Sequence, residues 1–155
     1  MRFALAGVAI SSVILAGCEV SDKDVVWIDT ERAVEFQNRR ESDPRAALFI
    51  DPRPTDSFES AHIPGAINSS LATFDGEKGI DPRIAQFESI VVYGQNAGDK
   101  SVAAVAKRML KIGYSDVFAY SGGLDEWSRS RLPVQTGPSA SLPPIEKSTR
   151  RGASR

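Results

Sequence analysis

The segment from residue 90 to residue 106 constrains the fold of this 155-residue chain more than any other. Four apolar residues, 90–93, lead into a loop rich in glycine and polar residues, and an alanine-rich stretch follows. This order predicts a strand, a loop and a helix. The loop consists of Gly94, Gln95, Asn96, Ala97, Gly98, Asp99, Lys100 and Ser101. Backbone N–H groups at such a helix start point outward, where the helix dipole favours negative charge, so the segment predicts an anion-binding loop.

Four further segments, most of them largely apolar, predict strands at residues 25–28, 47–51, 66–68 and 117–120. The segments between them are long enough for the crossover connections that parallel strand pairing requires. Apolar residues at helical spacing predict a helix over 31–40, capped by Asp29 or Thr30, and another over about 100–112, ended by Gly113. The sequence therefore predicts an α/β three-layer sandwich, with a five-stranded parallel sheet and helices on both faces.

Two motifs follow strands of this predicted sheet. The first, residues 51–68, starts with Asp51 and Arg53 at a strand end, where the two charges can pair and fix the following turn. Its second half contains His62, Pro64 and Gly65, and the Pro-Gly pair predicts a turn into the next strand. The second motif, residues 121–134, contains Gly122, Gly123, Trp127 and Pro133.

In this order the two motifs resemble the two signatures of rhodanese-like domains, and the resemblance covers about residues 25–136. It implies the parallel α/β sandwich predicted above, a turn-bracing role for His62 and core packing for Trp127. Two positions depart from the pattern. Ala61 stands where the family usually has glycine, and Arg131 stands where glycine is common.

The resemblance also implies a chemistry that this chain lacks the means to perform. Rhodanese-like enzymes transfer sulfane sulfur through a cysteine persulfide, formed when a thiolate in the amide-lined loop attacks a donor such as thiosulfate. That cysteine corresponds to Gly94, which has no side chain. The chain's single cysteine is Cys18, far away in sequence. Because a persulfide needs a reactive thiol, no catalytic residue is assigned and sulfurtransferase activity is not expected.

Other features of the loop favour the same interpretation. Tyr93 and Ser101 are poor substitutes for the cysteine, because the sequence places no base to activate either. The loop is one residue longer than the commonest sulfurtransferase version and approaches the length found in the family's dual-specificity phosphatases, which also need the cysteine. Asp99 adds negative charge near the expected anion site, and Lys100 opposes it. We therefore interpret the loop as vestigial, with weak anion binding.

Composition excludes several other functions. The formal net charge of −1 gives no general case for nucleic-acid binding. A single cysteine excludes an intrachain disulfide, and a single histidine excludes a site built from several imidazoles. No metal and no cofactor is expected.

The N-terminus resembles the signal of bacterial lipoproteins. Residues 1–17 contain a charged start and an apolar run too short to span a bilayer comfortably, and residues 15–18 read Leu-Ala-Gly-Cys, which resembles a lipobox. The resemblance implies cleavage before Cys18 and acylation of that residue, including palmitate, which anchors the chain stably. Residues 18–24 would form the lipidated N-terminus and a short linker. The alternatives are an ordinary secretory signal with a chance cysteine, or a buried N-terminal helix.

The C-terminal residues differ in composition from the predicted domain, residues 25–136. Residues 137–155 are rich in proline, serine and arginine, which predicts a disordered tail. The tail is basic, with a net charge of +3 from Lys147, Arg150, Arg151 and Arg155 against Glu146.

Three functional hypotheses follow from the sequence. The favoured one is a membrane-anchored, catalytically inactive rhodanese-like domain that acts as a binding or regulatory module in the bacterial cell envelope. Its expected partners are the membrane, through the lipid, and an envelope protein that the sequence does not identify. Glu19 slightly favours the outer membrane, on its periplasmic side. The alternatives are a sulfurtransferase-type enzyme with a non-cysteine site and a purely structural envelope lipoprotein.

Overall fold

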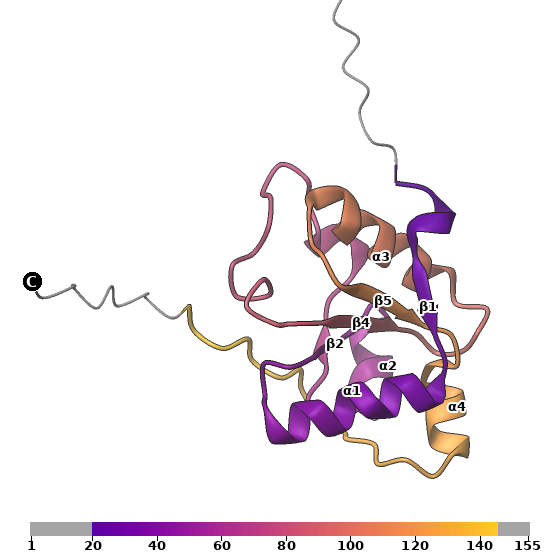
Figure 1. The fold of residues 1–155 in the computed structure, drawn as a ribbon. Coiled ribbons are helices and arrows are strands. Elements are labelled where there is room, and N and C mark those ends of the chain that lie inside the picture. The colour runs from indigo at the N-terminus through magenta and orange to yellow at the C-terminus, as the bar shows by residue number, and fades with distance from the viewer. Residues whose placement is uncertain (1–19, 146–155) are drawn as a thin grey trace, which may run out of the picture.

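A computed structural model describes residues 20–145 and contains a five-stranded sheet in the order β1-β5-β4-β2-β3 (Figure 1). All four strand pairs are parallel, which confirms the predicted α/β fold class. The strands are β1 (Val26–Ile28), β2 (Leu48–Asp51), β3 (Ile67–Asn68), β4 (Ile90–Tyr93) and β5 (Val117–Tyr120). Each lies within one residue of its predicted bounds, so the predicted segments located the sheet correctly.

Helices cover both faces of the sheet, as predicted (Figure 1). One face carries α3 (Lys100–Ile112) and the 3₁₀ turn η2 (Leu71–Thr73). The other face carries α1 (Thr30–Ser42), α2 (Thr55–Ser60) and α4 (Gly123–Arg129). Successive side chains of a strand point to opposite faces. For this reason the central strands β4 and β5 are apolar throughout and supply both cores.

The core beneath α1, α2 and α4 is the more aromatic of the two. Trp127 is 1 % exposed, and its ring lies edge-on to those of Phe49 and Tyr120 at centroid distances of 6.3 Å. The indole N–H donates to the carbonyl oxygen of Pro133 at 2.8 Å, so the single polar group of this buried side chain has a hydrogen-bond partner. The expected core-packing role of Trp127 agrees with these contacts.

The helix ends follow local sequence signals. Asp29 caps α1 by accepting a hydrogen bond from the backbone N–H of Arg32 at 2.9 Å. Gly113 ends α3 with φ at 108°, a left-handed conformation that glycine adopts without a Cβ penalty. Both features match the predicted caps.

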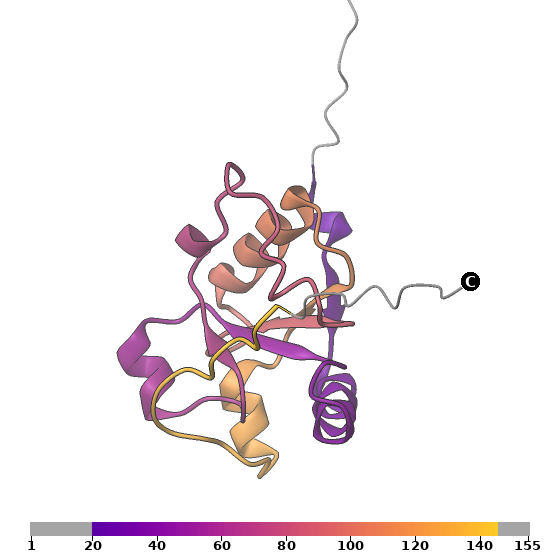
Figure 2. The same ribbon diagram turned by 90° about the vertical axis from the view of Figure 1, so that its left-hand side faces the viewer.

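The chain after Gly137 differs from its predicted disorder as far as residue 145. The N–H of Asn68 donates to Ser139 Oγ at 2.9 Å, and the N–H of Ala140 donates to the carbonyl oxygen of Ala66 at 3.3 Å. Leu142 packs against the core beneath α3. This segment therefore lies along the β3 edge of the sheet (Figure 2). The composition of this segment did not predict its packing, because these contacts join residues about seventy positions apart.

The predicted linker is also partly ordered. Residues Asp22–Asp24 form the 3₁₀ turn η1, and Asp22 pairs with Lys107 of α3 at 2.6 Å. The predicted signal peptide, Cys18, and the charged end of the tail, residues 146–155, lie outside the described residues. Within residues 20–145 no helix is long and apolar enough to cross a bilayer. Residues 20–145 contain both apolar cores and all five strands of the sheet.

We expect the packed segment after Gly137 to contribute to stability. A chain ending at residue 136 should lose about 2 kcal/mol of unfolding free energy relative to one ending at residue 145, because it loses the backbone bonds to β3 and the burial of Leu142. Urea denaturation of residues 19–136 and 19–145 measures the difference, with residues 19–155 as the control. Equal midpoints for the two shorter chains would contradict the packing role.

Candidate functional site

The predicted anion loop lies at the carboxyl end of β4, between β2 and β5. In open α/β sheets, ligands bind outside the carboxyl ends of the strands, so this is the expected position for a site. Gly94 follows Tyr93 directly and is buried, whereas residues 96–98 are exposed. The loop ends at Asp99, the N-cap residue of α3.

The carboxylate of Asp99 points back into the loop and accepts hydrogen bonds from its backbone N–H groups. Asp99 Oδ2 accepts a hydrogen bond from the N–H of Gln95 at 3.0 Å. Its Oδ1 accepts from the N–H of Ser101 at 3.0 Å and from Ser101 Oγ at 2.6 Å. The loop therefore holds an anion, but that anion is a side chain of the loop itself.

The same carboxylate occupies the space beside Gly94. A Cβ atom built on Gly94 would lie 2.6 Å from Asp99 Cγ and 2.8 Å from Asp99 Cβ, and closer still to Oδ2. Such separations are far inside van der Waals contact, so any side chain at position 94 requires Asp99 to move. Position 94, which the resemblance assigns to the nucleophile, thus has no side chain, and the Asp99 carboxylate covers it.

The surroundings keep Asp99 ionised. Partial burial on its own would raise the pKa of Asp99, but hydrogen bonds from Ser101 and Gln95, together with the charge of Arg53, outweigh it and lower the pKa below its ordinary value. Lys100, which we expected to oppose this charge, is exposed and begins α3. The amides of the loop thus face a permanent negative charge at neutral pH.

The start of α4 holds the loop from the other side. The N–H groups of Leu124 and Asp125 donate to the carbonyl oxygens of Gly94 and Gln95, each at 2.9 Å. Gly123 has φ at 62°, and a Cβ there would lie 2.7 Å from the backbone of the loop. Gly123 therefore allows a close approach of the loop backbone that a side chain would prevent. A Cβ atom on Gly122 would instead meet the side chains of Tyr120 and Glu126.

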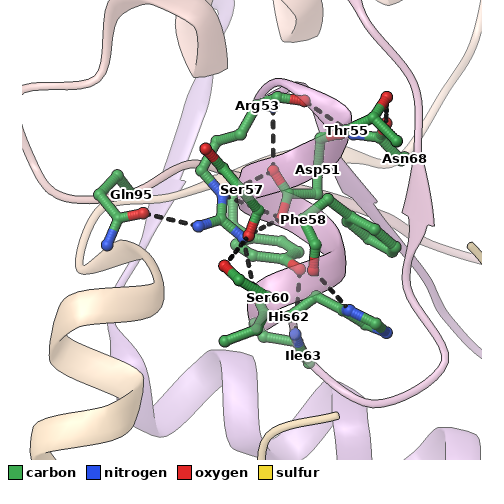
Figure 3. A network of polar contacts seen from close by, with 12 residues as sticks. Asp51, Arg53, Thr55, Ser57, Phe58, Ser60, His62, Ile63, Asn68 and Gln95 are labelled. Carbon is green, nitrogen blue, oxygen red and sulfur yellow. Dashed lines mark hydrogen bonds and ion pairs between the residues drawn. The ribbon is translucent and has the colours of Figure 1, made fainter. Parts of the chain in front are cut away.

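Arg53 is the buried cation below the loop (Figure 3). It pairs with Asp51 at 2.6 Å, through side chains that are 5 % and 0 % exposed. Its guanidinium also donates to the carbonyl oxygen of Ala61 at 2.7 Å and to Gln95 Oε1 at 2.6 Å. Gln95 in turn donates to Asp125. The expected Asp51–Arg53 pair is present, whereas the bridge through Gln95 to Asp125 was not predicted, because it joins residues 42 and 30 positions apart.

His62 is fully buried and braces a turn rather than facing the loop. Its ring stacks on Phe58 at a centroid distance of 3.9 Å, and Nδ1 donates to the carbonyl oxygen of Phe58 at 2.8 Å. The backbone of His62 forms two hydrogen bonds with Gln135, each at 2.8 Å. Pro64 and Gly65 follow, and Gly65 makes the predicted turn toward β3 with φ at 71°.

The two hydroxyl groups near the loop differ in what they contact. Ser101 does have an adjacent base, since its Oγ donates to Asp99, so the expectation that no base is placed beside it was wrong. A carboxylate with a lowered pKa is nevertheless a weak base. The Tyr93 hydroxyl is buried and accepts from the N–H of Ile63 at 3.0 Å. Burial, with the charge of Asp51, raises the pKa of Tyr93 well above its ordinary value.

No group of three or more candidate metal ligands occurs among residues 20–145. The groups gathered at this site are the loop amides, the Asp99 carboxylate and the buried pair of Asp51 and Arg53, with Gln95 bridging Arg53 to Asp125.

A family model for the rhodanese-like domain matches residues 32–130, which is more than half of the chain. The chain belongs to the rhodanese-like domain family. Thiosulfate sulfurtransferase GlpE of Pseudomonas syringae is 30% identical over 95 residues, covering 59% of this chain and 81% of the relative. GlpE of Haemophilus influenzae is also 30% identical over 95 residues, covering 59% of this chain and 83% of the relative.

Solved structures agree on the rhodanese-like fold. A protein from Rhodopseudomonas palustris, described as of unknown function and a possible tyrosine phosphatase, has a TM-score of 0.61 at 21% identity and covers 84% of this chain and 99% of its own. A Bacillus halodurans protein has a TM-score of 0.58 at 16% identity, with 82% and 88% covered. At such identities the likeness concerns the fold alone.

Replacing Asp99 tests its role as an internal anion. Asp99→Ala should lower the unfolding free energy by about 1 kcal/mol near neutral pH, and Asp99→Asn should cost less because asparagine still caps a helix. The folded-state pKa of Asp99 is lowered, so its contribution is full above about pH 4 and is lost as the pH falls through the folded value. Urea denaturation between pH 6 and pH 3 measures this. A difference in unfolding free energy between wild type and Asp99→Ala that grows as the pH falls would contradict this expectation.

Proposed function

We propose that this chain is a catalytically silent rhodanese-like domain, anchored by lipid in the bacterial cell envelope and used as a binding or regulatory module. The observation that carries the proposal is the covered position at Gly94. The family's reaction needs a thiolate there, with free amides around the transferred group. In this chain the Asp99 carboxylate lies in that space and accepts the N–H groups of Gln95 and Ser101.

Electrostatics supports the same conclusion. Thiosulfate is a dianion, and its approach would bring it against the ionised Asp99 at a few ångströms. Two unit charges 4 Å apart interact by roughly 4 kcal/mol at an effective dielectric constant of 20. Arg53 does not compensate, because its guanidinium is already shared among Asp51, Gln95 and a backbone carbonyl group. A donor anion therefore lacks both a nucleophile and a favourable potential.

The hydroxyl groups do not supply an alternative nucleophile. Ser101 Oγ is engaged with Asp99, whose lowered pKa makes it reluctant to accept the proton. Tyr93 lies below the loop, fully buried, with a raised pKa that keeps it protonated. Neither Ser101 nor Tyr93 therefore supports the enzyme hypothesis with a non-cysteine site.

The envelope location is proposed from Cys18 and the residues before it. A lipid on Cys18 would lie only a few residues from η1, which the Asp22–Lys107 pair holds against α3. At most about 3.5 Å per residue separates extended positions, so the domain would stay within a few nanometres of the bilayer. Such tethering suits a module that meets a partner at the membrane surface.

The domain should form no thiocyanate from thiosulfate and cyanide. In residues 19–155, Gly94→Cys alone should give at most slight activity, because Asp99 blocks the new side chain. Gly94→Cys combined with Asp99→Gly should give more, since glycine removes the Asp99 Cβ atom as well and is still tolerated as a helix cap. Asp99→Gly alone is the matched control and should be inactive. Turnover by the wild type, or equal turnover by the single and double cysteine variants, would count against the proposal.

The lipid anchor has an independent test. Cys18→Ser in the full chain should leave an unprocessed precursor and abolish palmitate labelling in bacterial cells, because serine offers no thiol for the acyl group. Labelling is followed by fluorography and processing by mass. A serine variant that is labelled and processed normally would refute the anchor without bearing on the silent site.

A further inference from the structure

A cavity lies at the opposite end of the sheet from the Gly94 loop. It has a volume of about 220 Å³ and lies where the end of α1, the starts of β2 and β3, and the segment 140–143 meet. Its walls are largely apolar and are formed by Leu48, Ile67, Phe87, Ala140 and Leu142. Among residues 20–145, no acidic residue lines it. The cavity depends on the ordered segment after Gly137, because that segment forms one wall.

Arg40 lines this cavity together with two other polar residues, Arg45 and Ser141. The Arg40 guanidinium donates through Nη1 to the carbonyl oxygen of Pro64 at 3.0 Å and through Nη2 to that of Gly65 at 3.1 Å. Gly65 allows this approach, since a Cβ atom there would overlap the guanidinium. Arg40 Nε is buried and has no hydrogen-bond acceptor. Within residues 20–145, Arg40 makes no ion pair with a carboxylate.

Arg40 differs in this respect from Arg53 and Arg39. Arg53 is buried and pairs with Asp51, and Arg39, the exposed neighbour of Arg40, pairs with Glu88. Burial lowers the pKa of Arg40, because it disfavours the charged form. A partly buried charge without a counter-ion is costly, and two carbonyl dipoles only partly offset the cost. An anion in the cavity would supply the missing charge.

We propose that this cavity binds a small monocarboxylate whose apolar body fills the space between Leu48, Ile67 and Phe87 while its carboxylate meets Arg40. The size fits, because an engineered apolar cavity of about 150 Å³ is known to hold benzene. The apolar walls disfavour a strongly hydrated ion such as sulfate or phosphate, which they cannot hydrogen-bond. The proposal is independent of the function proposed above, since the Gly94 loop takes no part in it.

Benzoate is a suitable probe, and benzamide is its uncharged counterpart of nearly equal shape. Titration of residues 19–155, followed by NMR shifts of the amides around Leu48, Ile67 and Ala140, should show saturable binding of benzoate. Benzamide should bind at least tenfold more weakly, as loss of a hydrogen-bonded charge implies. Failure of benzoate to saturate, or equal affinity for benzamide, would overturn the proposal.

Three variants and one truncation locate the site. Arg40→Gln should weaken benzoate about tenfold or more and leave benzamide unchanged, whereas Arg39→Gln, the matched control on the same helix, should change neither. Ala140→Phe keeps Arg40 but fills the cavity, and should abolish binding of both probes even if Arg40→Gln fails to fold. If Arg40→Gln and Arg39→Gln lowered the affinity for benzoate equally, the assignment of the site would be overturned. A tenfold gain in benzoate affinity on ending the chain at residue 145 would overturn it too, because the chain's own tail would then be the occupant.

Discussion

The loop end of the sheet depends on the buried pair of Arg53 and Asp51. From the end of β2 the guanidinium reaches the carbonyl group after α2 and the side chain of Gln95, and Gln95 continues the network to Asp125 of α4. Removing one partner of such a pair would leave an isolated charge in the interior, at a cost of about 3–5 kcal/mol. The ion pair thus holds the loop in shape through Gln95, without a bound ligand.

Much of the fold could be predicted because its signals are local. Largely apolar segments located most of the five strands, and Asp29 and Gly113 marked helix ends through the conformations that capping requires. The segment 137–145 could not be predicted in the same way. Its prolines and serines are typical of disorder, and its partners on β3 are distant in sequence, so composition reports only the tendency of the isolated segment.

The site was predicted less completely than the fold. The motifs identified Asp51, Arg53 and the glycine pair before Leu124, and the vacancy at Gly94 follows directly from the sequence. The role of Asp99 did not, although an aspartate before a helix is an N-cap signal. We interpreted its charge as repulsion toward an outside anion, whereas the carboxylate itself accepts hydrogen bonds from the loop. Membership of a family describes the scaffold, and function must be argued from the site that the scaffold carries.

The capped loop also determines how this protein can respond to its surroundings. Asp99 is bound covalently within five residues of Gly94, so its carboxylate meets the loop amides at an effective concentration of roughly molar or above, as for other well-oriented intramolecular groups. A dissolved anion at millimolar concentration competes against that value and occupies the amides only rarely. At millimolar concentrations of an external anion the loop thus stays occupied by its own chain, which makes it insensitive to modest changes in the ionic composition of the medium.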